Sequence, residues 1–288
     1  MSSECKNCTS ESCSARNKLN NESEQEFIDR QLLSSRMCKI KHKILVLSGK
    51  GGVGKSTVAA NLAIALSKRR KVGIVDIDIH GPSVPTIFNI TYPRVSQGEN
   101  EKTMLPIEIS DNLKAMSIGF LLSDSDDALI WRGPMKIGVI KQFLKDVEWG
   151  ELDYLIADLP PGTGDEPLSI CQMIEDINGA VIVTTPQEMA LADVRKSINF
   201  CRKVKVPIIG VIENMSGFKC PECGKVTDIF KKGGAEEMCF NMGVPFLGRI
   251  PLTPEIVIQA DAGSFHSSES EVTELFKPVI ERIVSGND

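Results

Sequence analysis

"LSGKGGVGKST", residues 47–57, decides the fold of this chain. It follows the apolar run 43–48 ("KILVLS") and precedes a helix-like segment over 55–69. The pattern G-x-x-x-x-G-K-[ST] is met by Gly49, Gly54, Lys55 and Ser56. Glycines let backbone N–H groups close around a phosphate, and the next helix points its positive end at it. The sequence therefore predicts a phosphate-binding loop between a buried strand and a helix.

The residue types in this loop also predict chemistry. Lys55 would reach the β- and γ-phosphates of a nucleotide, and the Ser56 hydroxyl would hold Mg²⁺. One alternative is a glycine-rich turn that binds nothing, which the flanking strand and helix disfavour. Another is a dinucleotide-binding loop, a poorer match because "GVGKST" lacks the final Gly or Ala of that motif.

The rest of the chain alternates between strand-like and helix-like segments. β-Branched runs occupy 71–76, 153–158, 179–185 and 206–212, and helix-like segments fall near 134–147, 166–176, 189–203 and 271–284. Buried strands separated by helices predict an α/β fold, with a doubly wound, mainly parallel sheet flanked by helices. Residues 91–112 break this rhythm and are interpreted as an insertion. The last helix carries Glu271, Glu274 and Glu281 against Lys277 and Arg282, so we expect it to pack on the core and not on a membrane.

Composition bounds the compartment and the partners. The 288 residues are 42% hydrophobic with a net charge of −5, which argues against a general affinity for nucleic acid or for an anionic membrane. We expect a flexible cysteine-containing tail over 1–36, with a short helix over 23–33, and one ATPase domain over 37–288. The first forty residues lack the apolar block of a secretion signal, so a cytoplasmic protein is expected. Nine cysteines in such a compartment favour metal binding over disulfides.

Carboxylates follow two of the predicted strands. Asp76 and Asp78 end the strand at 71–76, and Asp158 ends the strand at 153–158. Such residues at the carboxyl edge of a parallel sheet face the ligand crevice. They can order the Mg²⁺ shell, Asp158 through a water, and orient an attacking water, while an amide of the following loop, near Gly162, can sense the γ-phosphate. The alternative is that some of them only cap turns.

The stretch "CPECGK" places Cys220 and Cys223 two positions apart. A tetrahedral metal or an iron–sulfur cluster wants about four thiolates. The missing ligands can come from Cys5, Cys8 or Cys13 near the N-terminus, or from a second copy of the chain. The third alternative is that nothing completes the site, which leaves a redox dithiol.

Four motifs together resemble one family. "GKGGVGKST" resembles the deviant Walker A loop of MinD, ParA, the nitrogenase iron protein and the Mrp/ApbC group. With "DIDIHGPS", "DLPPGTGD" and "ENMSGFKCPECGK", the chain is identified over about 40–285 as resembling the Mrp/ApbC P-loop ATPases. The resemblance implies a MinD-like fold and a homodimeric ATPase that binds an iron–sulfur cluster and delivers it to apoproteins. We expect ATP turnover to be slow, because the chemistry would serve a switch, and from the composition we expect no nucleic-acid or membrane partner.

The resemblance also implies roles for single residues. Lys50 would reach across the dimer to the partner's nucleotide, Lys55 would act on the phosphates, and Asp78 would orient water, with Asp76 nearer the metal. Asn214 and the loop "GRIPLTPEI" with Pro251 would read adenine, so ATP is favoured over GTP. The residues expected around the nucleotide are Gly49, Lys50, Gly51, Gly52, Val53, Gly54, Lys55, Ser56, Thr57, Asp76, Asp158, Gly162, Asn214 and Pro251.

In the implied dimer, symmetry would double the cysteine pair. Every interface residue of a two-fold dimer occurs twice, so Cys220 and Cys223 would supply four thiolates for one bridging four-iron four-sulfur cluster. Zinc at the same thiolates is the competing interpretation. The alternative function is a positioning or regulatory ATPase of the MinD or ParA kind, with a structural zinc at the pair.

The N-terminal cysteines pose a separate question. Some family members carry a four-cysteine site there, and Cys5, Cys8 and Cys13, with Cys38 as fourth ligand, would be its counterpart. The leading distant cysteine of that pattern is missing and one spacing is a residue short, so a second cluster and a flexible thiol-rich tail stay open as alternatives. Cys171, Cys201 and Cys239 are interpreted as small buried hydrophobes.

Overall fold

A central eight-stranded sheet organises the chain. The computed structural model describes residues 15, 17–90, 95–98, 102–121, 133–263 and 271–285. The strand order is β10-β7-β6-β1-β5-β2-β4-β3, and all neighbours pair in parallel except the edge strand β3. The strands are β1 (Ile40–Ser48), β2 (Val72–Asp76), β3 (Ile107–Ser110), β4 (Leu113–Ser117), β5 (Leu152–Asp158), β6 (Gly179–Thr184), β7 (Ile208–Glu213) and β10 (Phe246–Arg249).

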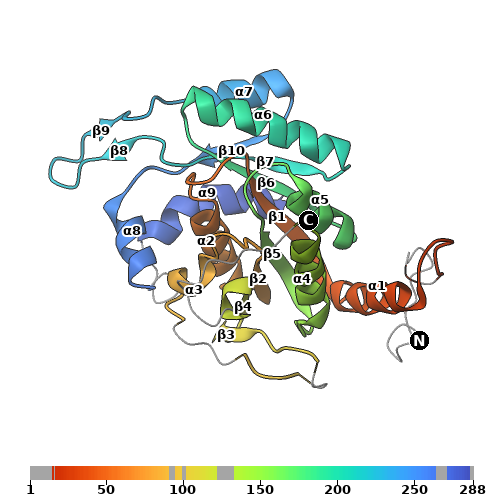
Figure 1. Ribbon diagram of the computed structural model, residues 1–288. Helices are drawn as coiled ribbons and strands as arrows, with labels where there is room; N and C mark the ends of the chain where they lie inside the picture. Colours follow the sequence, from red (N-terminus) through yellow and green to blue (C-terminus); the bar gives the residue numbers. More distant parts are fainter. Residues whose placement is uncertain are drawn as a thin grey trace.

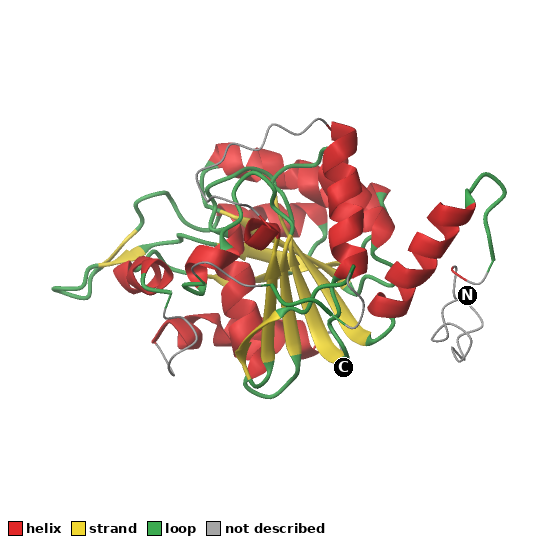
Figure 2. Ribbon diagram, turned by 60° about the horizontal axis from the view of Figure 1, so that its bottom comes forward, coloured by secondary structure: helices red, strands yellow, loops and turns green. Residues whose placement is uncertain are grey.

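Helices cover both faces of this sheet (Figures 1 and 2). Right-handed crossovers place α2 and α9 on one face and α4 to α7 on the other. The order of strands reverses between β1 and β5, which creates the crevice where α/β sheets bind ligands. The doubly wound, mainly parallel fold is therefore confirmed. The helices are α1 (Glu24–Met37), α2 (Lys55–Ser67), α3 (Val84–Ile87), α4 (Gly133–Asp146), α5 (Asp165–Met173), α6 (Glu188–Lys203), α7 (Gly234–Met242), α8 (Pro254–Asp261) and α9 (Glu271–Ser285), with a 3₁₀ turn η3 (Ile118–Leu121).

The predicted helix at the end of the chain packs on the core. Phe276, Val279 and Ile283 of α9 are each about fully buried, and the helix contacts α2 and β10. The apolar face of α9 is therefore buried against the core, as expected. Within the described ranges, no helix is both long and apolar enough to span a bilayer.

The interpretation of 91–112 as an insertion needs correction at its end. β3 lies inside this segment, and β4 follows it and pairs with β2 from Val72↔Leu113 to Asp76↔Ser117. The two strands extend the sheet instead of interrupting it. The sequence did not predict these strands, because "IEIS" and "LKAMS" are short and partly polar, whereas buried central strands give long apolar runs.

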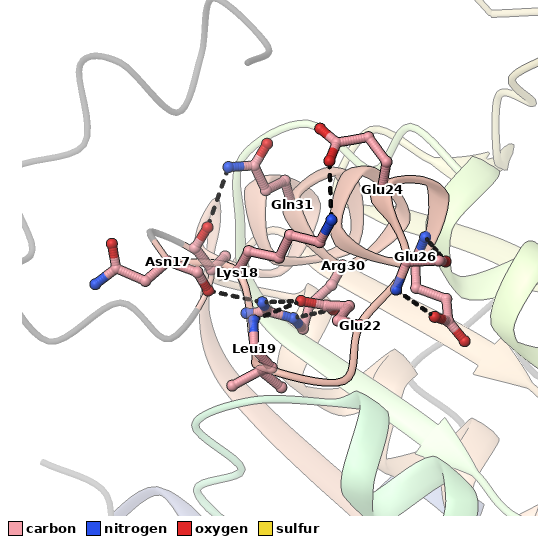
Figure 3. A network of polar contacts seen from close by, with 10 residues as sticks. Asn17, Lys18, Leu19, Glu22, Glu24, Glu26, Arg30 and Gln31 are labelled. Atoms are coloured by element: carbon pink, nitrogen blue, oxygen red, sulfur yellow. Dashed lines mark hydrogen bonds and ion pairs between the residues drawn. The ribbon is translucent and has the colours of Figure 1, made fainter.

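Helix α1 lies within the segment expected to be a tail. It is capped by Ser23, whose hydroxyl accepts from the Glu26 N–H while the Glu26 side chain accepts from the Ser23 N–H. Arg30 pairs with Glu22 at 2.7 Å in the network of Figure 3. Leu33 and Met37 join the hydrophobic core, so the packed part of the chain includes α1. Cys5, Cys8 and Cys13 lie outside the described residues.

Candidate functional site

The loop after β1 has the backbone that its glycines allow. Gly52 and Gly54 have φ of +77° and +81°, a region that favours glycine. Gly54 also begins α2 as its N-cap. A Cβ atom on Gly54 would lie 2.3 Å from the Asn214 side-chain nitrogen. Position 54 therefore demands glycine for two reasons, its φ angle and the close approach of Asn214.

A cavity of about 530 Å³ opens beside this loop, within the range of small-molecule sites. The predicted residues that line it are Lys50, Gly51, Gly52, Gly54, Lys55, Ser56, Thr57 and Asp78. Sequence reasoning missed Gly81, Pro82 and Ser83, which line it from the loop after β2, and Pro161, which lines it from the loop after β5. Their signal was present in the quoted motifs "DIDIHGPS" and "DLPPGTGD".

Lys55 lies buried between two carboxylates. Its Nζ donates to Asp158 Oδ1 at 2.6 Å and lies 3.6 Å from Asp78 Oδ2. Burial raises the pKa of Asp158, and the charge of Lys55 together with hydrogen bonds from Lys55 and Ser56 opposes that rise. Within the described part of the chain, Asp158 Oδ2 makes no hydrogen bond although it is buried. A hydroxyl beside an unpaired carboxylate oxygen is a donor set of the hard oxygen type that suits Mg²⁺.

Asp76 stands behind the cavity instead of in it. Its Oδ1 accepts from the Asp78 N–H, and its Oδ2 accepts from the Val84 N–H and the Ser117 hydroxyl, each at 3.1 Å. Burial, and then the charge of Asp158, raises the pKa of Asp76 to about 7. Asp76 therefore holds the loop that presents Asp78, while Asp78 itself reaches the cavity.

The predicted base-reading residues lie on the far side of the phosphate loop. The Asn214 amide donates to the Val53 carbonyl at 2.9 Å. Its backbone N–H donates to the Thr184 carbonyl at 2.7 Å, and the Ser216 N–H donates to the Ile250 carbonyl, next to Pro251. Asn214 and Pro251 are not among the residues that line the cavity. Gly162, at φ +93°, donates its N–H to the Ser48 carbonyl at 2.8 Å.

The paired cysteines sit on a projecting hairpin. The strands β8 (Phe218–Lys219) and β9 (Val226–Thr227) extend away from the body, as Figures 1 and 2 show. Cys220 is half-buried and Cys223 is exposed. Hydrogen bonds from the backbone of Cys223 and Glu222 and from the Cys223 side chain lower the pKa of the Cys220 thiol. The turn thus favours the thiolate, the form that binds metals.

The hairpin does not bring together a complete metal site by itself. Across the residues that the structure describes, no group of three or more His, Cys, Asp or Glu side chains is arranged to hold a metal ion. Burial raises the pKa values of Cys171, Cys201 and Cys239 to about 11, 12 and 12, which makes them inert. The Cys38 thiol donates to the Ser34 carbonyl at 2.9 Å.

Sequence reasoning missed a buried carboxylate at the root of the hairpin. It connects the two ends of the excursion 214–233, the segment between β7 and α7 (Gly234–Met242) that contains the hairpin. Glu213, which ends β7, is fully buried. It accepts from the Ser216 hydroxyl at 2.6 Å, the Ala235 N–H at 2.9 Å and Arg249 Nε at 3.2 Å. Its sequence signal is an acidic residue directly after the apolar run "IIGVI", which calls for internal partners.

Comparisons with known proteins agree with this geometry. The chain matches the family described as ParA: NUBPL iron-transfer P-loop NTPase over residues 39–284. It is 52% identical over 254 residues to the iron-sulfur cluster carrier protein of Methanocaldococcus jannaschii, covering 88% of this chain and 87% of that one. A nucleotide-binding protein of Archaeoglobus fulgidus, solved in complex with ADP and with cobalt, shares 40% identity at a TM-score of 0.74, covering 85% and 96%. The cell division ATPase MinD of Pyrococcus furiosus shares 26% identity at a TM-score of 0.61, covering 85% and 98%.

Proposed function

This chain belongs to the NUBPL iron-transfer P-loop NTPase family, and from that premise we propose that it carries a four-iron four-sulfur cluster between two subunits and transfers it to apoproteins under the control of ATP. The observation that carries the proposal is the cysteine pair on the projecting hairpin. Cys220 and Cys223 offer two thiols, with backbone donors that favour the thiolate. The described residues arrange no third ligand beside them.

Two-fold symmetry supplies the missing half of the site. A homodimer with the hairpins at its axis presents four thiolates, the number that a four-iron cluster needs. The exposed position of Cys223 allows it to reach a ligand shared with a second chain. The cluster is cargo in this proposal, and apo iron–sulfur proteins are its recipients.

The cavity beside the phosphate loop is proposed to bind and slowly hydrolyse ATP. Lys55 contacts the β- and γ-phosphates, Asp78 orients the attacking water, and Lys50 serves the partner's nucleotide. Ser56 and, through a water, Asp158 would hold Mg²⁺, which neutralises phosphate charge when bound. Asn214 and Pro251 would contact adenine after a rearrangement, since neither lines the cavity in this structure.

Hydrogen bonds offer a route by which a structural change at the nucleotide could reach the cluster. The Asn214 side chain is bonded to Val53 of the phosphate loop at 2.9 Å. Three residues later the chain enters the root of the hairpin, where the Leu252 N–H donates to the Gly217 carbonyl at 2.8 Å. A nucleotide that shifts the phosphate loop or the 250–252 loop would therefore move the root of the hairpin, and with it the grip of the thiols on the cluster.

The likeness to MinD keeps one alternative function in view, a regulatory ATPase with a structural zinc at the pair. A role in positioning at a membrane would want an accessible amphipathic helix, yet the apolar face of α9 is buried. We also propose a cytoplasmic location. At the N-terminal cysteines, a second cluster held by Cys5, Cys8, Cys13 and Cys38 and a flexible thiol-rich tail stay open as alternatives.

Counting metal per chain tests the proposed function. After anaerobic purification, we expect about four irons and four sulfides per two chains, in a protein with the mass of a dimer. The comparison is made in a background with Cys5, Cys8 and Cys13 changed to Ser, which isolates the hairpin site. Changing Cys220→Ala together with Cys223→Ala should remove this iron, whereas the control Cys171→Ala should keep it. One zinc and no sulfide would favour the regulatory alternative, and a cluster-loaded monomer would overturn the shared site.

A further inference from the structure

A cluster of three polar side chains lies beside the cavity and outside the motifs discussed so far. Lys136, in the first turn of α4, donates from Nζ to Glu166 Oε1 at 2.9 Å and to His80 Nε2 at 2.7 Å. An ammonium only donates, so His80 accepts at Nε2 and carries its proton on Nδ1. The Lys136 side chain is 15% exposed and that of Glu166 is 22% exposed, whereas the His80 side chain is 56% exposed.

Each partner of Lys136 lies near a loop that lines the cavity. His80 lies in the loop after β2, and its N–H donates to Asp78 Oδ1 at 3.3 Å. The next residues of that loop, Gly81 and Pro82, line the cavity. The Lys136–His80 contact therefore acts directly behind the carboxylate that faces the ligand.

The second partner connects to the loop after β5, which follows the strand next to β2 in the sheet. Glu166 is the second residue of α5, which begins where the loop after β5 ends. Pro161 of that loop lines the cavity, and Gly162 is bonded to Ser48 at 2.8 Å. One ammonium thus spans the two loops whose relative position sets the geometry around the γ-phosphate.

We propose that Lys136 is a positioning residue that holds the loop after β2 in register with the loop after β5, and that this register is required for hydrolysis and not for nucleotide binding. The second half of the inference rests on the proposed function. Helix α4 gives Lys136 a fixed base, because its other end is tied to α1 by Lys145 and Asp29 at 3.1 Å. Phosphate binding depends on the loop after β1, whereas the hydrogen bonds of Lys136 go to the loop after β2 and to α5.

The competing interpretation is an ordinary surface ion pair, which contributes little to stability and has no effect on catalysis. The two differ in what they do to turnover. Catalysis is sensitive to misplacement on the scale of an ångström, so loss of the bridge should slow the chemical step while ATP still binds.

Three variants on one helix separate these interpretations by steady-state kinetics. For Lys136→Met we expect kcat for ATP to fall about 10-fold, with KM within about 2-fold of the unaltered protein. Lys136→Arg keeps a charged donor that can reach both partners, and it should recover most of kcat. The control Lys141→Met removes a lysine of α4 that faces α1 through Asp29, and it should match the unaltered protein.

Hydrogen exchange of the nucleotide-free protein tests the register without requiring turnover. Peptides covering 77–84 and 159–168 should exchange faster in Lys136→Met than in Lys141→Met. The inference is overturned if neither segment changes, if only one does, or if KM rises as much as kcat falls. Absence of ATP hydrolysis by the unaltered protein would instead overturn the proposed ATPase, and the exchange data would still decide whether Lys136 sets the register.

Discussion

Asp76 and Asp158 end neighbouring strands in the same register, so two carboxyl groups meet at one edge of an apolar sheet. Both are fully buried. Lys55 compensates one of them, through its 2.6 Å contact with Asp158. Asp76 has neutral donors instead, and its pKa rises to about 7, first because burial disfavours the carboxylate and then because the nearby charge of Asp158 disfavours double ionisation.

A pH dependence follows from Asp76. Its pKa is about 7 in the folded protein against an ordinary value of 3.8. Between these values the unfolded chain has released the proton and the folded chain has kept it, so the free energy of unfolding falls as pH rises. The slope from one proton is at most about 1.4 kcal/mol per pH unit. The stability of the unaltered protein relative to Asp76→Asn should therefore decline from about pH 4 to about pH 7 and level off above it.

Denaturant unfolding across this pH range measures the difference. Asp153→Asn serves as control, because the hydrogen bond from Lys41 lowers the pKa of Asp153. That carboxyl is ionised in both states above about pH 5, so its difference should be flat there. A flat or rising difference for Asp76→Asn would show that Asp76 is ionised in the folded protein at pH 5.

At the scale of elements, the root of the cysteine hairpin depends on one side chain. Glu213 ends β7, and the excursion that leaves there returns as α7 (Gly234–Met242). Its carboxylate bonds Ser216 at the start of the excursion and Ala235 at its end. Arg249 of the edge strand β10 completes the set. The hairpin is therefore held at its base while its tip projects.

Removing the charge of Glu213 should loosen the root of the hairpin. Glu213→Gln places an amide against backbone donors, and we expect a loss of about 2–4 kcal/mol in the free energy of unfolding. Hydrogen exchange should accelerate over residues 216–235. The control Glu236→Gln removes the exposed carboxylate that Arg249 also contacts, and it should cost under about 1 kcal/mol. Equal losses for both variants would refute the anchoring role.

At the scale of the whole molecule, the phosphate loop and the hairpin are connected through Asn214. Asn214 donates a hydrogen bond to Val53 of the phosphate loop, and the chain then runs directly into the hairpin. A switch needs such a link between two sites with separate ligands. In the proposed dimer both ends of this link would lie at the same interface.

Cluster transfer should therefore require Lys55 although Lys55 is far from the thiols in sequence. We expect Lys55→Ala to retain the cluster after anaerobic purification yet to lose about 10-fold or more in the rate of transfer to an apoprotein. The control Lys68→Ala removes an exposed lysine at the end of the same helix. Circular dichroism verifies folding, since Lys55→Ala leaves buried Asp158 without its cation. Transfer at the unaltered rate would remove ATP from the mechanism.

Local patterns in the sequence determined much of this protein. The phosphate loop was predicted from its motif. The five central strands were predicted because central parallel strands are apolar throughout. The helices were predicted from the segments between these strands, near 55–69, 134–147, 166–176 and 189–203. The cavity residues Lys50, Lys55 and Asp78 were also predicted from the sequence. Each of them lies in a contiguous motif, and a contiguous motif fixes its own local geometry. The cysteine pair was also predicted from its spacing.

Only the tertiary structure decided which distant residues meet. The strands β3, β4 and β10 are short and lie toward the edges of the sheet, where packing and not pattern selects them. Lys136 met His80 and Glu166, and Glu213 met Ala235 and Arg249, through contacts between elements far apart in the chain. A lone lysine or glutamate carries no periodic signal, because its partners are chosen by how helices stack on the sheet and not by its neighbours in sequence.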